Sequence, residues 1–134
     1  MQLEESVRHF LEERRFAVVA TINADGSPQQ TVLWYYVDGD EIVMNTAAGR
    51  RKPFNLRRDA RLSFCVESDY RYVAISGTAE LIEDQETAQA DIRWLAILNN
   101  GPEKGARQSE EQFSKQHRIT IRLKAEKVDA YGFS

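Results

Sequence analysis

Residues 16–46 read FAVVATINADGSPQQTVLWYYVDGDEIVMNT, and the order of residue types in this stretch predicts the architecture of the chain. Runs of β-branched and aromatic residues alternate with turn residues, with the runs at 16–23, 28–37 and 41–46. Ala-Asp-Gly-Ser at 24–27 is typical of a hairpin turn, and Asp-Gly-Asp follows the second run. We therefore predict three antiparallel strands in hairpin order.

Three further strands are expected outside this stretch. Two are predicted at 61–67 and 70–82, and the last begins at Ile119 and runs on to Tyr131. Gly77 interrupts the longest run and indicates a bulge of the kind that bends a barrel. Six strands in mostly hairpin order predict an α+β fold with a small antiparallel β-barrel core.

Helices are expected around this barrel. Leu3, Val7, Phe10 and Leu11 recur at helical spacing in the first segment. Further helices are predicted over 53–58, beginning at a proline, over 83–99, and from a capping box at 109–112, with a loop at 101–107. No linker divides the chain, so residues 1–134 are expected to form one domain.

The composition excludes several classes of protein. The chain has 134 residues, 42% of them hydrophobic and 29% charged, which is typical of a folded globular domain. Cys65 is the only cysteine, so a disulfide scaffold is excluded and a reducing compartment is favoured. The most apolar stretch, 16–22, is too short to span a bilayer, and the acidic start does not resemble a signal peptide. We expect a cytoplasmic protein that binds neither membranes nor, with a net charge of −3, nucleic acid.

The basic segment, residues 49–61, is the least ordinary part of the sequence. It carries six of the 18 basic residues and one acid, Asp59. Arg50 and Lys52 directly precede the helix predicted at Pro53, and a helix N-terminus beside such cations is a natural phosphate site. The alternative is a solvated basic face that pairs with acidic helices. The residues alone leave both interpretations open.

Aromatic residues form a second feature. Trp34 and Tyr36 share one face of a strand and Tyr35 takes the other, and Tyr70 and Tyr72 also share a face. Packing or a subunit interface is the ordinary reason for such residues. Beside the basic segment they could instead stack a planar ring next to a phosphate, or bases of single-stranded nucleic acid.

The usual catalytic groups are scarce. Cys65 alternates with apolar strand residues, and His9 and His117 show no metal-ligand spacing. The sequence contains neither a Walker motif nor Gly-x-Gly-x-x-Gly. If the protein is an enzyme, a bound cofactor is expected to carry the reaction.

The sequence resembles the split-barrel flavin and deazaflavin oxidoreductases, the superfamily that includes pyridoxamine 5′-phosphate oxidase. The resemblance covers nearly the whole chain and is strongest at 18–37, 45–61, 72–82 and 128–133. Gly-Arg-x-Lys-x-x-Asn-Leu-x-x-Asp at 49–59 looks most like the branch that uses coenzyme F-420, a deazaflavin. Pro53 and Ala60 depart from the family pattern beside this motif.

The resemblance implies a six-stranded split barrel that forms a homodimer, with cofactor clefts between the subunits. By this resemblance Arg50 and Lys52 bind the cofactor phosphate, while Asn55 and Thr46 support the loop. Three further implied residues line the deazaflavin ring, namely Gln29, Thr31 and Val32. Tyr70 and Tyr72 are implied to come from the partner chain and to cover the cofactor or shape the substrate pocket.

The implied activity is transfer of a hydride from reduced F-420 to a small organic acceptor, such as a quinone, an unsaturated lactone or a tetrapyrrole. Tyr72 is the candidate proton donor. An FMN-binding oxidoreductase of the same superfamily is the first alternative. A non-catalytic cofactor-binding protein and a nucleic-acid binder are the others. Pyridoxamine-phosphate oxidase activity itself is not expected, because the chain ends at Ser134 without a longer C-terminal substrate-binding part.

Overall fold

The computed structural model describes residues 2–13 and 16–133. The helices within these ranges are α1 (Glu5–Glu13), α2 (Arg51–Arg58), α3 (Gln85–Asn100), α4 (Pro102–Glu111) and the 3₁₀ turn η1 (Phe113–Lys115). The strands are β1 (Phe16–Ile22), β2 (Pro28–Trp34), β3 (Tyr36–Asp38), β4 (Glu41–Ala47), β5 (Arg61–Ser68), β6 (Arg71–Ile82) and β7 (Arg118–Tyr131).

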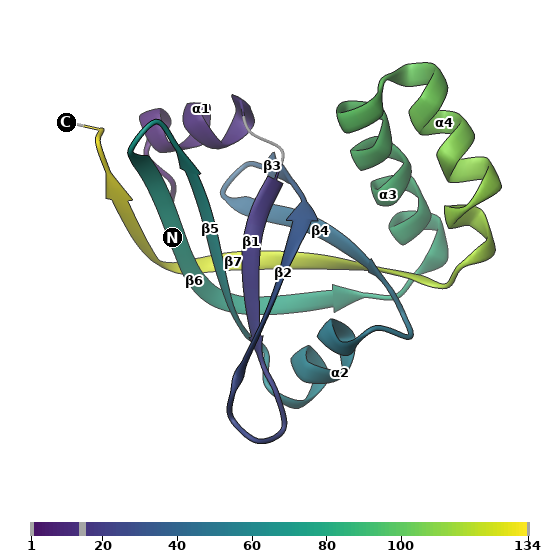
Figure 1. The fold of residues 1–134 in the computed structure, drawn as a ribbon, viewed down its shortest axis with the longest axis horizontal. Coiled ribbons are helices and arrows are strands. Elements are labelled where there is room, and N and C mark those ends of the chain that lie inside the picture. Colours follow the sequence, from purple (N-terminus) through teal and green to yellow (C-terminus); the bar gives the residue numbers. More distant parts are fainter. Residues whose placement is uncertain (1, 14–15, 134) are drawn as a thin grey trace.

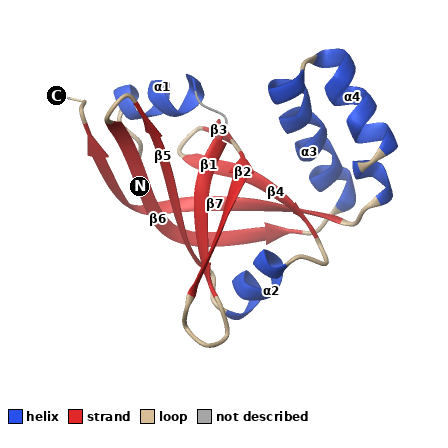
Figure 2. Cartoon of the chain, in the orientation of Figure 1, coloured by secondary structure: helices blue, strands red, loops and turns tan. Residues whose placement is uncertain are grey.

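The strands form one antiparallel sheet in the order β2-β1-β5-β6-β7-β4-β3. The sheet curls into a half-barrel, with the long strands β6 and β7 running across its middle (Figure 1). The α3–α4 pair packs outside one part of the sheet, and α1 and α2 lie toward opposite ends (Figure 2). The predicted α+β class with an antiparallel split-barrel core is confirmed.

The predicted strand at 28–37 is wrong in one respect, because it divides at Tyr35. Tyr35 is buried, its hydroxyl donates to the Leu11 carbonyl at 2.8 Å, and its ring packs edge-on against Phe64. Before this residue β2 pairs with β1, and after it β3 pairs with β4 at the other edge of the sheet. The described residues therefore form seven strands rather than six.

The predicted loop at 101–107 is also wrong, because it is the body of α4. Gly101, with a φ of 90°, ends α3, and Pro102 begins α4 at once. Gly105 lies so close to α3 that a Cβ would stand 2.5 Å from the Ile97 nitrogen. A glycine that suggests a loop in the sequence thus allows two helices to pack closely, and the predicted capping box falls at the end of α4 instead of opening a helix.

The bulge predicted at Gly77 is confirmed. The β6–β7 register shifts between Ser76 and Gly77, and a Cβ on Gly77 would lie 2.0 Å from the Lys124 carbonyl oxygen. The last strand does run on to Tyr131. The bulge lets β6 and β7 bend together, which closes the sheet around its core.

Two apolar clusters hold the fold. The larger fills the space between the sheet and α1, and Tyr35 belongs to it. The smaller joins α3 to Phe113 of η1, and Trp34 and Tyr36 pack against it. The predicted alternation of these three aromatic residues is therefore confirmed. No helix within the described ranges is long and apolar enough to cross a membrane.

Candidate functional site

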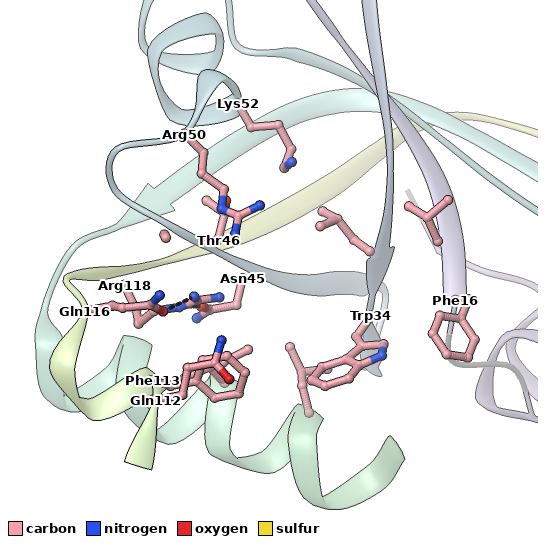
Figure 3. A pocket seen from close by; sticks show the side chains of 15 residues that line it. Phe16, Trp34, Asn45, Thr46, Arg50, Lys52, Gln112, Phe113, Gln116 and Arg118 are labelled. Carbon is pink, nitrogen blue, oxygen red and sulfur yellow. Dashed lines mark hydrogen bonds between the residues drawn. The ribbon is translucent and has the colours of Figure 1, made fainter. Parts of the chain in front are cut away.

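A pocket of about 240 Å³ opens between β2, β4, the start of α2 and the α3–η1 cluster (Figure 3). One half of it is polar and cationic, and its lining side chains are those of Asn45, Thr46, Arg50, Lys52, Gln112, Gln116 and Arg118. The other half is apolar and is formed mainly by Phe16, Val32, Leu33, Trp34, Ile92, Leu95 and Phe113. This division suits a ligand with an anionic end and a planar apolar body.

Lys52 is buried at the cationic end of the pocket. Its side chain is 4% exposed, and its Nζ donates to the Thr31 Oγ1 at 3.0 Å. Burial lowers the pKa of Lys52, and the charge of Arg50 lowers it further. No acidic side chain among the described residues lines this pocket, so the two cations face each other without a counter-charge.

The start of α2 adds donors to the same end. Arg50 is the N-cap of the helix, and its side chain makes no capping hydrogen bond. The first N–H groups of a helix have no partner within the helix. Neither does the Arg50 guanidinium form a hydrogen bond or ion pair with a side chain in the described ranges. Backbone and side-chain donors are thus both available to an anion here.

Thr46 supplies an unsatisfied hydroxyl. The residue is 3% exposed, and its buried Oγ1 has no hydrogen-bond partner among the described residues. It lines the pocket together with Arg50 and Lys52. A buried hydroxyl without a partner costs about 1–3 kcal/mol. A ligand oxygen in the pocket would remove that cost.

Three other basic residues of the segment have structural partners. Arg57 pairs with Glu83 at 2.8 Å, and Arg61 pairs with Asp59 at 2.6 Å. Arg58 donates to the Ile22 carbonyl and to Asn55. The segment therefore divides: its second half makes the ion pairs and anchoring contacts of an ordinary basic face, whereas Arg50 and Lys52 in its first half line the pocket.

Several residues predicted from the resemblance meet here. Val32, Thr46, Arg50 and Lys52 line the pocket, and Thr31 contacts Lys52 directly. Asn55 and Gln29 lie behind them, and both hydrogen-bond to the Thr21 hydroxyl, at 3.0 and 3.1 Å. Asn55 also donates to Asn23 at 3.1 Å, so it ties α2 to the β1–β2 hairpin. No hydrogen bond joins Thr46 to the loop within the described part of the chain.

Tyr70 and Tyr72 lie elsewhere. Tyr70 is at the β5–β6 turn with a φ of 66° and is almost fully exposed. Tyr72 stacks on Tyr131, with ring centroids 5.7 Å apart. Neither lines the pocket of its own chain. Their role over the cofactor stays a prediction that requires a second subunit.

The sequence prediction missed the far wall of the pocket. Arg118, Gln116 and Phe113 come from the β7 start and from η1, about 70 residues after β4 in the chain (Figure 3). The register pairs Asn45 with Thr120 and Ala47 with Arg118, which brings this wall to the pocket. The available signal was the polar pair Asn45–Thr46 within an otherwise apolar strand.

Other chemistry is sparse. Burial raises the pKa of the Cys65 thiol, with a smaller contribution from Glu67, so this cysteine is not an activated nucleophile. No group of three or more potential metal ligands occurs in the described portion of the chain.

Comparison with known proteins identifies the family. A family model described as pyridoxamine 5′-phosphate oxidase matches residues 3–131. The chain belongs to this family. A pyridoxine/pyridoxamine 5′-phosphate oxidase from Kineococcus radiotolerans is 39% identical over 71 residues, which cover 52% of this chain. The match spans only 32% of that larger protein.

Several solved structures share the fold. A conserved hypothetical protein from Mycobacterium tuberculosis is 29% identical, with a TM-score of 0.83 over 99% of this chain and 86% of its own. A structure named as an F-420 reductase gives 0.76 at 21% identity over 95% and 98% of the two chains. The heme storage protein HutZ from Vibrio cholerae gives 0.73 at 20% over 100% and 98%. These likenesses show that the fold is shared by proteins whose names point to different ligands.

Proposed function

We propose that this family member binds coenzyme F-420 in the pocket and is a reductase that transfers a hydride to a small organic acceptor. The observation that carries the proposal is the cationic end of the pocket, where Arg50 and Lys52 face inward without an acidic partner among the described residues. The motif at 49–59 supports the deazaflavin branch, and a similar fold named as an F-420 reductase is compatible with it.

The residues present fit the group. A phosphate would accept hydrogen bonds from Lys52, Arg50 and the unsatisfied Thr46 hydroxyl. The planar ring would lie on the apolar half, against Val32 and Trp34. The phosphate would supply the counter-charge for Arg50 and Lys52 and the hydrogen-bond partner for Thr46 that the described residues do not provide.

When bound, reduced F-420 supplies the hydride. The chain contributes binding and orientation: Lys52, held by Thr31, fixes the anionic end, and the apolar wall from α3 and η1 keeps water from the ring. Basic groups at the site stabilise negative charge that develops on the acceptor. No catalytic histidine or cysteine is needed for these tasks, which agrees with the scarcity of such groups in the sequence.

We further propose that the protein acts as a homodimer through the outer sheet face, defined as Phe16, Val18, Val32, Cys65 and Ala74 with their exposed neighbours. Val18 lies opposite both Val32 and Cys65, and Cys65 lies opposite Ala74, so one apolar row crosses four strands. Phe16 and Val32 are 59% and 64% exposed on this face and also line the pocket.

A second copy is the occupant that fits this face. It would cover the apolar row and complete the pocket, whose volume in one chain is below the roughly 300 Å³ of small ligand sites. Tyr72 shares the face with Ala74, so the same contact would bring it toward the partner's cofactor. A role for Tyr72 as proton donor depends on that contact.

The test is a fluorescence titration of the purified apo-protein with F-420 and, in parallel, with FMN. Saturable F-420 binding with weak FMN binding supports the proposal, and a screen of electron acceptors then looks for reduction. Preferred FMN binding would move the protein to the flavin branch. Tight F-420 binding without reduction of any acceptor would favour a non-catalytic carrier, and binding of neither would overturn the cofactor assignment.

A further inference from the structure

Arg118 is a buried cation of the pocket to which the function proposed above assigns no role. Its side chain is 6% exposed at the start of β7 and lines the pocket. It forms no ion pair with any carboxylate in the described ranges, and its guanidinium lies 4.9 Å from the Phe113 ring centroid. Burying a charge without a counter-charge is energetically costly. A negatively charged ligand in the pocket would offset that cost.

The guanidinium is held firmly in one orientation. Its Nε donates to the Asn45 Oδ1 at 2.9 Å, and one Nη donates to the Gln116 Oε1 at 2.7 Å. Asn45 is itself fixed, because its amide donates to the Ala88 carbonyl at 2.9 Å and to the Thr120 hydroxyl at 3.3 Å.

The network ends on a carboxylate that does not reach the arginine. The Thr120 hydroxyl donates to Asp91 at 2.6 Å, and Asp91 also accepts from Tyr36 at 2.8 Å. Two neutral side chains, Asn45 and Thr120, therefore separate Asp91 from Arg118. Three of the five guanidinium N–H groups, one on Nη1 and both on Nη2, make no hydrogen bond with the residues described.

The three cationic side chains of the pocket favour the binding of two anionic groups. Arg50 and Lys52 already provide two positive charges from the α2 side for one phosphate. Arg118 stands on a different wall, with Phe113, Gln112 and Gln116 (Figure 3). The charge of Arg50 acts on both Lys52 and Arg118, so the three cations share one pocket and repel one another. A second anion beside the phosphate would balance the third charge.

We propose that Arg118 binds a carboxylate of the acceptor, through the N–H groups of its guanidinium that have no partner among the described residues, while the apolar body of the acceptor packs against Phe113. This inference rests on the proposed function, because it assumes that the cofactor phosphate occupies the Arg50–Lys52 end. It names the substrate class as a planar or aromatic carboxylic acid. Asn45 and Gln116 are positioning residues that orient Arg118.

The test uses benzoate as the probe and uncharged benzamide as its control, on protein loaded with F-420. The Nε–H signal of Arg118 is followed by NMR and assigned by its loss in Arg118→Lys. Benzoate should shift this signal saturably and benzamide should not, and Arg118→Gln should weaken benzoate binding by at least about tenfold, as expected for loss of a bidentate charged contact. F-420 affinity of Arg118→Gln should stay within about twofold, because the phosphate contacts remain.

Two results would overturn the inference. One is an Nε–H signal of Arg118 whose position does not change when benzoate is added to wild-type protein. This measurement does not depend on the folding of any variant. The other is a loss of F-420 affinity in Arg118→Gln as large as that in Lys52→Ala, which would place Arg118 on the cofactor phosphate. If wild-type protein fails to bind F-420, the proposed function fails, and a benzoate-specific shift of Arg118 in that same sample still supports the carboxylate site.

Discussion

Lys52 Nζ donates to Thr31 Oγ1 at 3.0 Å, and this contact joins the first turn of α2 to the middle of β2. It places a buried ammonium group at a fixed point of the pocket wall. A lysine side chain is otherwise flexible, so the hydrogen bond removes much of the ordering that ligand binding would require. The cation is thus prepared for an anion before the anion arrives.

Lys52→Ala should weaken F-420 binding by about tenfold or more, because a charge-assisted hydrogen bond contributes about 1.5–3 kcal/mol. Arg57→Ala is the matched control: it removes one positive charge from the same helix, but Arg57 pairs with Glu83 outside the pocket. Fluorescence titration of both variants gives the comparison. Equal losses in the two variants would mean that only net charge matters, and unchanged affinity in Lys52→Ala would remove the basic segment from the site.

The contribution of Lys52 to the stability of the apo-protein should rise with pH on the alkaline side. Burial lowers the pKa of Lys52 from 10.5, so between the folded and unfolded pKa values the unfolded chain binds more protons. Deprotonation of Lys52 therefore adds to the free energy of unfolding as pH rises through that window, whereas the raised pKa values of Cys65 and Tyr36 act in the opposite direction. Denaturant unfolding from pH 8 toward 10.5 should therefore give a more positive slope of the free energy of unfolding against pH in wild-type protein than in Lys52→Met. An equal slope in both would contradict a depressed pKa at this residue.

Thr46→Val should separate stability from binding. The substitution keeps the shape and removes the hydroxyl that lacks a partner in the described structure, so the apo-protein should be as stable or more stable, by up to about 1 kcal/mol. F-420 affinity should fall, since one donor to the phosphate is lost. Thermal unfolding and titration of the same preparation measure the two effects. A clear loss of apo stability would show that the hydroxyl has a structural partner.

Val18→Lys should convert the proposed dimer to a monomer. Val18 is 44% exposed at the centre of the outer sheet face, and a buried lysine there would have no described carboxylate opposite it in its own sheet. Trp94→Lys is the control, because Trp94 is similarly exposed but lies on α3. Light scattering after size-exclusion chromatography reports the mass. A wild-type monomer, or a Val18→Lys dimer, would refute this interface.

Gly105→Ala should destabilise the fold by about 1–3 kcal/mol, as expected for overpacking. The new Cβ would stand 2.5 Å from backbone atoms of α3, which cannot move aside as a flexible side chain can. Gly49→Ala is the control, since a Cβ there meets no atom within 4 Å. Chemical denaturation of both variants checks the difference. A Gly105→Ala variant as stable as Gly49→Ala would mean that the two helices have room to separate.

Local rules predicted the regular parts of the fold well. Strand periodicity located the strands, and the glycine at position 77 indicated the bulge that the β6–β7 register now shows. The same rules failed at Tyr35, where the chain leaves one sheet edge for the other without any break in strand-forming residues. They failed again at Gly105, because close helix packing and loop flexibility both use glycine.

The amino-acid sequence by itself determined most of the strand positions, the barrel class and the basic segment that supplies two of the pocket cations, because these depend on neighbours within a few residues. Only the tertiary structure decided which cations face the pocket. Arg57 and Arg61 found acidic partners, whereas Arg50 and Lys52 did not find any in the described structure. The tertiary structure also places Arg118 beside Asn45, although the two residues are 73 positions apart in the sequence. Such pairings depend on how the curled sheet aligns β4 with β7. The register between two strands that lie far apart in the sequence cannot be read from the spacing of residues within either strand.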